Sequence, residues 1–173
     1  MQINPLYTQE AEAIKKALKQ DGIIILHDFF TTTVANNLSI KMKAETWKKE
    51  YVPDKYHRER AQQFRSNEFT RFIRRITGIT KNIVSFGCRF GSGDYTLLND
   101  AQHPISVFVT IDLTKNWNSK WGGYTVLERN DEQPAIIASK FNSLVIGTDV
   151  QEFVKYVNHG AGKRKRILIR SIE

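Results

Sequence analysis

Residues with the right chemistry for a catalytic or metal site stand at the two ends of the second half of the chain. The phrase GDYTLLND (93–100) ends in Asp100, and the phrase EFVKYVNHGAGKRKRILIR (152–170) contains His159 and a run of basic residues. A carboxylate and an imidazole are the minimum that a divalent metal ion would need from these two phrases. They can act together only if the fold brings both phrases to one place.

The sequence pattern between these phrases predicts a fold that could do so. From residue 83 onward short runs of Val, Ile, Phe, Tyr and Thr alternate with Gly, Asn, Asp and Lys, which is typical of β-strands joined by turns. Such a succession indicates a β-sandwich or barrel. Eight strands are predicted, at 83–90, 94–98, 105–113, 123–128, 134–138, 142–147, 151–158 and 166–172.

The N-terminal part has a helical pattern. Apolar residues at helical spacing predict a helix over 7–21, with Thr8 as N-cap and Gly22 after its end. A buried strand (IIILHDFF), a helix from about 31 to 51, an exposed polar loop at 52–65 and a short basic helix capped by Ser66 follow. The whole pattern predicts an α+β, mainly β fold, a double-stranded β-helix (jelly roll) with N-terminal helices packed on its major sheet.

The length and composition of the chain limit the number of domains that it can form. With 173 residues, of which 40% are hydrophobic, we expect one domain over 1–173. Residues 1–82 would form the helical support layer and loop, and residues 83–173 the β-helix core. The single cysteine, Cys88, excludes an internal disulfide, the first residues lack the apolar core of a signal peptide, and no apolar run approaches a bilayer span. These features predict a cytoplasmic protein with no membrane partner.

Four phrases in the second half together resemble the prolyl-4-hydroxylase-like branch of the 2-oxoglutarate/Fe(II) dioxygenases. They are YTLLND, ISVFVTIDLTKNWNSKWGG, FNSLVIG and FVKYVNHGAGKRKR, in the family's order, over roughly residues 84–171. The family has a His-x-Asp pair, a Gly-Gly turn after a Trp, an Asn-containing strand, a distal His and a basic residue. The resemblance implies the chemistry of that family, in which two imidazoles and one carboxylate hold Fe(II) beside 2-oxoglutarate.

The metal ligands that the resemblance implies are incomplete in this chain. In one alignment the proximal pair falls on Leu98 and Asp100, and in a shifted register it falls on Asn99 and Ala101. Either alignment loses one ligand. The distal position falls on Glu152 within Glu-Phe-Val or on the His of YVNHGAG. The candidate metal ligands are therefore Asp100, His159 and Asn99, with Glu152 as an alternative.

The cosubstrate-binding residues that the resemblance implies are present. The family's basic residue opens the last strand and pairs with the distal carboxylate of 2-oxoglutarate. This position corresponds to Arg166, with Arg164 as the second candidate, and Tyr95 would supply a hydroxyl group.

The positive charge of the chain is unevenly distributed. The net charge is +8, and residues 41–89 hold 13 of the 26 Lys and Arg against 5 acids. Such a basic surface could form a border around the barrel mouth and attract RNA, a ribonucleoprotein or an acidic protein. The arginines expected on this border are Arg58, Arg60 and Arg65 on the polar loop and Arg71, Arg74 and Arg75 on the basic helix.

Two functions are therefore predicted. The first is a hydroxylase that uses Fe(II) and 2-oxoglutarate and acts on a protein side chain, prolyl in type. The second is a catalytically inactive dioxygenase-fold module without cofactors, which binds a macromolecular partner through its basic surface. The missing proximal His leaves enzyme status open, because the loss of outer-shell groups alone already weakens metal binding tenfold or more.

Overall fold

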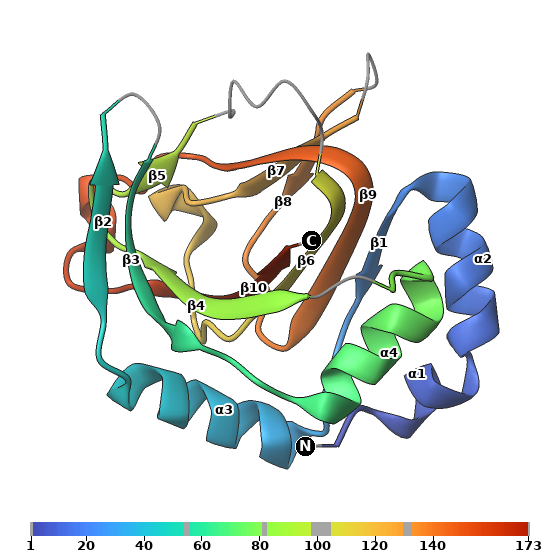
Figure 1. The fold of residues 1–173 in the computed structure, drawn as a ribbon. Helices are drawn as coiled ribbons and strands as arrows, with labels where there is room; N and C mark the ends of the chain where they lie inside the picture. The colour runs from blue at the N-terminus through green and yellow to red at the C-terminus, as the bar shows by residue number, and fades with distance from the viewer. Residues whose placement is uncertain (1, 54–55, 81–82, 98–104, 130–132, 173) are drawn as a thin grey trace.

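The computed structural model describes residues 2–53, 56–80, 83–97, 105–129 and 133–172. In these residues ten strands form one antiparallel sheet in the order β2-β3-β4-β10-β6-β9-β7-β8, with β1 paired to β9 and β5 paired to β3 (Figure 1). The strands are β1 (Ile23–Leu26), β2 (Lys48–Val52), β3 (Tyr56–Gln63), β4 (Val84–Phe90), β5 (Tyr95–Thr96), β6 (Ile105–Asp112), β7 (Thr125–Glu128), β8 (Ala135–Ile137), β9 (Ser143–Val154) and β10 (Arg166–Ile172).

Strand β9 turns this sheet into a barrel. Its first part pairs with β6 and β1, and its last residues pair with β7. Between the two parts Asp149 has a positive φ of 53°, which is uncommon for a residue other than glycine, and the register with β6 continues from Gly147 to Val150 without a shift. The two strands predicted at 142–147 and 151–158 are instead replaced by one strand that ends at Val154, because the pairing with β6 continues where the sequence indicates a turn.

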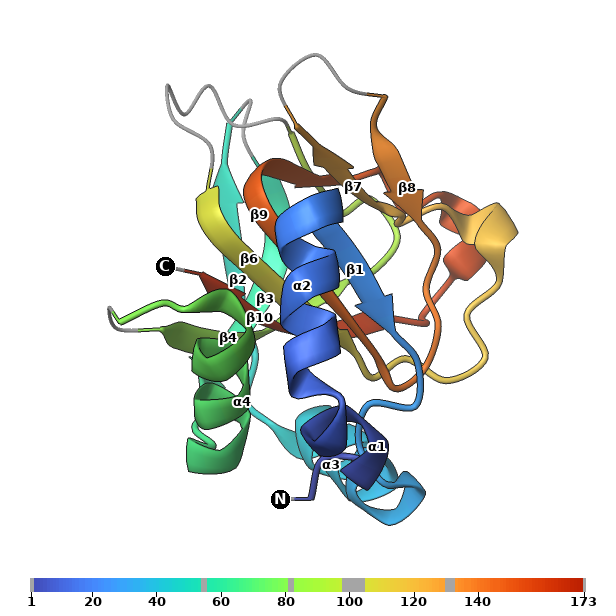
Figure 2. The same cartoon turned by 90° about the vertical axis from the view of Figure 1, so that its right-hand side faces the viewer.

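The helices pack on the outer face of the larger part of the sheet (Figure 2). They are α1 (Pro5–Gln9), α2 (Ala11–Asp21), α3 (Thr32–Ala44) and α4 (Asn67–Thr77), with single turns η1 (Ser119–Trp121) and η2 (His159–Ala161). Ile14 of α2 and Phe72 of α4 share a buried cluster with Val109 and Ile169 of the sheet. The prediction of a mainly β fold with N-terminal helices on its major sheet is confirmed. None of the helices in the described ranges is long and apolar enough to cross a membrane.

The ends of α4 agree with the sequence prediction. The Ser66 hydroxyl accepts a hydrogen bond from the Phe69 amide at 3.2 Å, and Gly78 ends the helix with a φ of 78°. These are the N-cap and C-terminal signals that the sequence contains. The predicted helix at 7–21 is instead two helices that meet at Glu10, and its N-terminal cap is Asn4 rather than Thr8.

The region between residues 45 and 65 differs from its prediction. The second long helix ends at Ala44 rather than near residue 51, and the segment predicted as an exposed loop forms the β2–β3 hairpin. The polar sequence conceals the hairpin because β2 and β3 extend the edge of the sheet and carry charged side chains on both faces. The arginines predicted on a loop, Arg58 and Arg60, therefore lie on β3.

Alternation along β10 and β6 separates the helix-facing side of the sheet from the barrel interior. Ile167 and Ile169 pack in the cluster that includes the helices, whereas Leu168 packs with Phe86 and Cys88 of β4. The residues of β10 that share the inner face with Leu168 are Arg166 and Arg170. In the register of the two strands, these inner positions adjoin Thr110 and Asp112 of β6.

Candidate functional site in the barrel interior

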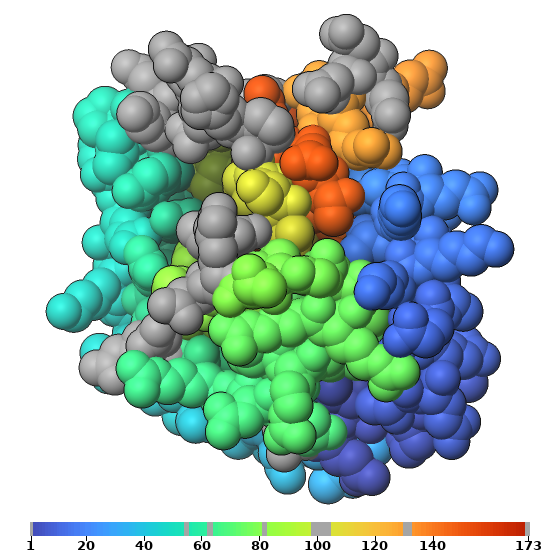
Figure 3. Space-filling model, turned by 45° about the vertical axis from the view of Figure 1, so that its right-hand side comes forward, coloured from blue at the N-terminus to red at the C-terminus, as the bar shows by residue number. Residues whose placement is uncertain are grey.

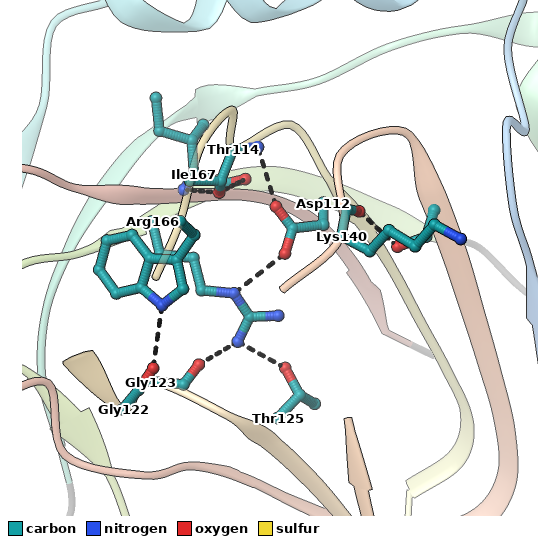
Figure 4. Close-up of polar contacts among 10 residues, drawn as sticks. Asp112, Thr114, Gly122, Gly123, Thr125, Lys140, Arg166 and Ile167 are labelled. Atoms are coloured by element: carbon teal, nitrogen blue, oxygen red, sulfur yellow. Dashed lines mark hydrogen bonds and ion pairs between the residues drawn. The ribbon is translucent and has the colours of Figure 1, made fainter. Parts of the chain in front are cut away.

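Arg166 is buried in the barrel and bonded to protein groups. It is only 2% exposed, and its Nε lies 3.0 Å from Oδ2 of Asp112. Its Nη1 donates to the Gly123 carbonyl and to the hydroxyl of Thr125, at 3.1 Å from the latter (Figure 4). The other carboxylate oxygen of Asp112 accepts a hydrogen bond from the Thr114 amide at 2.8 Å. The guanidinium is therefore paired with a buried carboxylate of the same chain.

A second buried ion pair lies further along β10. Nη2 of Arg170 donates a hydrogen bond to Oε2 of Glu152, which is on β9, and both side chains are about 5% exposed or less. The Phe108 ring centroid is 5.5 Å from the Arg170 guanidinium carbon. Burial lowers the pKa of Arg170 because desolvation penalises the charged form, and nearby Arg58 acts in the same direction. The interior therefore contains a fixed cation held by one carboxylate.

Several buried polar atoms beside this pair lack hydrogen-bond partners among the described residues. They are Nε and Nη1 of Arg170, Oε1 of Glu152 and Oγ1 of Thr110. Buried polar groups are normally satisfied, because an unmade hydrogen bond in a low dielectric costs free energy. The hydrogen bond between Arg170 and Glu152 therefore satisfies only part of the hydrogen-bonding capacity of the two buried side chains.

Strand β3 adds two further arginines to the same side of the sheet. Arg60 lies opposite Cys88 in the register of β3 and β4, and its guanidinium carbon is 3.9 Å from the Phe86 ring centroid. Arg58 lies two residues away on the same face, with its Nε 3.0 Å from Oε2 of Glu50. Two of the six arginines predicted on a border around the barrel mouth thus lie on β3 and face the barrel.

A network of charges that the sequence analysis did not single out lies at the rim, near β3, β4 and β5. His57 Nδ1 is 2.7 Å from Oδ1 of the buried Asp94, and Lys165 Nζ is 4.0 Å from the other oxygen of that carboxylate. Glu59 accepts a hydrogen bond from Arg89 and lies 3.6 Å from Lys165 Nζ. Burial alone would raise the pKa of Glu59, but the hydrogen bond and charge of Arg89 and the charge of Lys165 together lower it.

The structure separates the other predicted site residues. His159 is exposed on η2, and its Nδ1 lies 3.0 Å from the Ser92 hydroxyl. Tyr95 is half-buried on β5 and pairs with His57 of β3. Arg164 is exposed outside the barrel, with its guanidinium carbon 4.9 Å from the Trp121 ring centroid. The predicted ligands Asn99 and Asp100 lie outside the described residues.

The described residues do not by themselves make up a complete Fe(II) centre. No group of three His, Cys, Asp or Glu side chains close enough to hold a metal ion occurs in the described part of the chain. Of the candidate ligands that are described, Glu152 alone is buried in the barrel, and it is already paired with Arg170. A guanidinium beside a carboxylate repels a divalent cation and competes for the same oxygen atoms.

The signals for these interior charges are present in the sequence. Asp112 ends the apolar run ISVFVTID, and Arg170 occupies an alternate position of RILIRS, in phase with Leu168. A charged residue on the same face of a strand as apolar residues indicates either that the strand lies at a sheet edge or that the charge belongs to a buried ion pair. The sequence alone does not say which carboxylate each arginine meets, because the partners lie 54 and 18 residues away.

Comparison with known proteins places this geometry in a family. The family described as "Oxoglutarate and iron-dependent oxygenase degradation C-term" matches residues 48–171. No curated protein sequence matches the chain. The chain has a fold similar to that of a Pseudomonas putida prolyl-4-hydroxylase, with a TM-score of 0.75 at 12% identity, over 94% of this chain and 97% of that one.

Two further solved structures have the same fold. A prolyl hydroxylase from Trichoplax adhaerens, in complex with a hypoxia inducible factor peptide fragment, gives a TM-score of 0.74 at 16% identity, over 95% of this chain and 88% of that one. The viral collagen prolyl hydroxylase of Paramecium Bursaria Chlorella virus-1 gives 0.58 at 15% identity, over 87% and 94%. At these identities the likeness shows the fold.

The family match covers most of the chain, and the structural likeness covers nearly all of it. The family uses Fe(II) and 2-oxoglutarate. In this chain the barrel interior contains the buried pair of Glu152 and Arg170. The chain belongs to the oxoglutarate- and iron-dependent oxygenase degradation C-terminal family, and its fold is that of the prolyl-4-hydroxylases.

Proposed function

We propose that this chain is a metal-independent binding module built on the dioxygenase fold. The observation that supports this function best is the buried pair of Glu152 and Arg170. Glu152 stands where one alignment with the family puts the distal ligand. The Glu152 carboxylate already pairs with an internal guanidinium, so a metal ion would have to compete for its oxygen atoms. The guanidinium also repels that ion.

The 2-oxoglutarate position supports the same proposal. Arg166 corresponds to the basic residue that the family uses for the distal carboxylate of the cosubstrate. Here its charge is countered by Asp112 at 3.0 Å, and its Nη1 already has two acceptors. A cosubstrate carboxylate would therefore meet a neutralised pair rather than an unpaired cation.

The alternative is a hydroxylase that acts on a protein side chain, prolyl in type. It is favoured by the three structural neighbours, whose names identify them as prolyl hydroxylases. In this alternative Fe(II) would be held by Asp100 together with His159, and it would support hydroxylation by dioxygen coupled to the oxidation of 2-oxoglutarate to succinate and carbon dioxide.

Anaerobic titration with Fe(II) and 2-oxoglutarate distinguishes the two functions. We expect the wild-type protein to show no visible charge-transfer band of the iron chelate, no iron by elemental analysis after gel filtration, and no turnover of 2-oxoglutarate. The Asp100→Ala variant should behave identically. Iron retained by the wild type and lost from Asp100→Ala would overturn the proposal and establish the hydroxylase.

The partner that we propose is an acidic polymer, RNA or a ribonucleoprotein, bound at the exposed face of α4. Helix α4 forms a broad part of the surface beside the N-terminal helices (Figure 3). Arg71, Arg74 and Arg75 are exposed there, and Arg75 also forms an ion pair with Glu12 at 3.3 Å. Because Arg58 and Arg60 face the barrel, the proposed basic face is limited to Arg65 and these three arginines.

Salt dependence tests this partner. For a single-stranded RNA, the logarithm of affinity should fall with the logarithm of salt concentration by about 0.7 for each neutralised phosphate. Replacing Arg71, Arg74 and Arg75 by Gln should lower that slope by about two units. Salt-independent binding, or no binding of RNA at low salt, would exclude RNA as the partner of this face.

A further inference from the structure

A small pocket outside the barrel is lined by four cations and no acid. It has a volume of about 290 Å³ and lies where the end of α3, the segment after β6 and the turn before β10 meet. Its lining also includes the half-buried indole of Trp117. The four cations come from segments far apart in the chain, so tertiary folding brings them together. They are Lys43, Lys115, Arg164 and Lys165.

Three of these cations have no acidic partner within the described residues. Lys165 lies near Glu59 and Asp94, at 3.6 and 4.0 Å, whereas Lys43, Lys115 and Arg164 take part in no ion pair there. Lys115 and Arg164 instead contact aromatic rings, with the Lys115 ammonium 5.1 Å from the Phe141 centroid and the Arg164 guanidinium over Trp121. Like charges that share one pocket repel each other, and a bound anion relieves that repulsion.

The backbone around the pocket is well fixed. The Leu113 amide donates to the Ile167 carbonyl at 2.9 Å, and the Ile167 amide donates to the Thr114 hydroxyl at 2.8 Å. Asn116 has a positive φ of 56°, which turns the chain directly after Lys115. The segments that carry Lys115 and Lys165 are thereby held against each other, so the backbone positions of these two cations are fixed before any ligand binds.

We propose that this pocket binds a phosphate group. A phosphate has several acceptor oxygens and one or two negative charges, which suits lysine ammonium groups and an arginine fork around a small concave site. The volume lies at the lower end of the range for small-molecule sites, so it admits a ligand of about mononucleotide size. The phosphate could belong to a small phosphorylated metabolite or to the backbone of a nucleic acid, and the site is independent of iron binding and of the α4 face.

Titration calorimetry at low salt tests the proposal with three probes: inorganic phosphate, adenosine 5′-monophosphate, and a short single-stranded RNA without terminal phosphates. We expect saturable binding of at least one probe by the wild-type protein. The double variant Lys115→Gln/Arg164→Gln should weaken that binding at least tenfold. Lys43→Gln, which changes an exposed residue of α3, should weaken it less.

The matched control is Lys16→Gln/Lys19→Gln, which removes the same charge from exposed positions on α2, outside both the pocket and the α4 face, and should change phosphate affinity less than twofold. A loss in Lys115→Gln/Arg164→Gln that affects phosphate and the mononucleotide but not the RNA would assign the group to a small metabolite, and a loss that affects only the RNA would assign it to a nucleic acid. No saturable binding of any probe, or an equal loss in the control, would overturn the proposal.

Discussion

The barrel interior and the pocket beside α3 both gather basic residues, but they differ in how those charges are balanced. Inside the barrel, Arg166 and Arg170 each face a buried carboxylate, Asp112 and Glu152 respectively. In the outer pocket, three cations have no acid among the described residues. An unpaired charge is very costly to bury, so each buried cation here is paired with a carboxylate of the fold. Solvated cations need no such partner and are therefore available to a ligand.

The largest expected change in stability comes from removing the carboxylate of the buried pair of Glu152 and Arg170. Glu152→Ala leaves the Arg170 guanidinium buried without a counter-charge, so the free energy of unfolding in urea should fall by about 3 to 5 kcal/mol. Glu152→Leu combined with Arg170→Met should recover most of this loss. The exposed pair of Arg75 and Glu12 is the control, and Glu12→Ala should cost at most about 1 kcal/mol. If Glu152→Ala and Glu12→Ala lowered the free energy of unfolding equally, the assignment of Glu152 and Arg170 as a buried pair would be contradicted.

A smaller effect is expected for the pair at the start of β10. Asp112→Asn removes the counter-charge of Arg166 but keeps an oxygen that can accept from the Thr114 amide. We expect a loss of about 2 to 3 kcal/mol, the order of a hydrogen bond to a charged group, measured by the same urea unfolding. If Asp112→Asn left the free energy of unfolding unchanged, the alternative in which Arg166 pairs with the cosubstrate would regain support.

At the rim between the barrel interior and the surface, Glu59 should contribute about 1 kcal/mol to the free energy of unfolding, and this contribution should depend on pH. The pKa of Glu59 is lowered in the folded state, so its ionised form stabilises the fold above the ordinary value of 4.5. That contribution should be lost as pH falls through the lower folded-state pKa. The stability difference between wild type and Glu59→Gln, measured by urea unfolding from pH 7 to pH 3, should therefore vanish at the acidic end. A difference that grows at low pH would contradict this assignment.

The smallest change in stability is expected for substitutions in the outer pocket. Lys115→Gln/Arg164→Gln removes charges that make no ion pair in the described structure, so stability without ligand should stay within about 0.5 kcal/mol of wild type. Thermal unfolding at low and high salt checks this. A large loss would mean that these cations hold the fold together in the same way as the interior pairs.

Local patterns in the sequence predicted several elements correctly. Ser66 and Gly78 marked the ends of α4, and period-two runs located β4, β6, β7, β8 and β10. The β2–β3 hairpin was missed because an edge hairpin with charges on both faces has no apolar alternation. Strand β9 was divided in two because Gly147 and Asp149 look like turn residues when only their neighbours in sequence are considered.

For the candidate site, the sequence supplied the residue types but not their pairing. It singled out Arg166 and Glu152 as positions of interest, yet it did not identify Asp112 or Arg170 as their partners. It placed Arg58 and Arg60 on the same border as Arg71, whereas β3 turns the first two toward the barrel. Which face a strand presents depends on its register with neighbours that are distant in the chain.

By itself, then, the sequence determined what depends on neighbouring residues: helix caps, strand periodicity, the order of the family's motifs and the excess of positive charge. The tertiary structure alone decided which charges are neutralised and which remain for a ligand. The reason is that the energy of a charge is set by burial and by the distance to its counter-charge. Both quantities arise only when β6, β9 and β10 close around one interior and α3 meets the turn before β10.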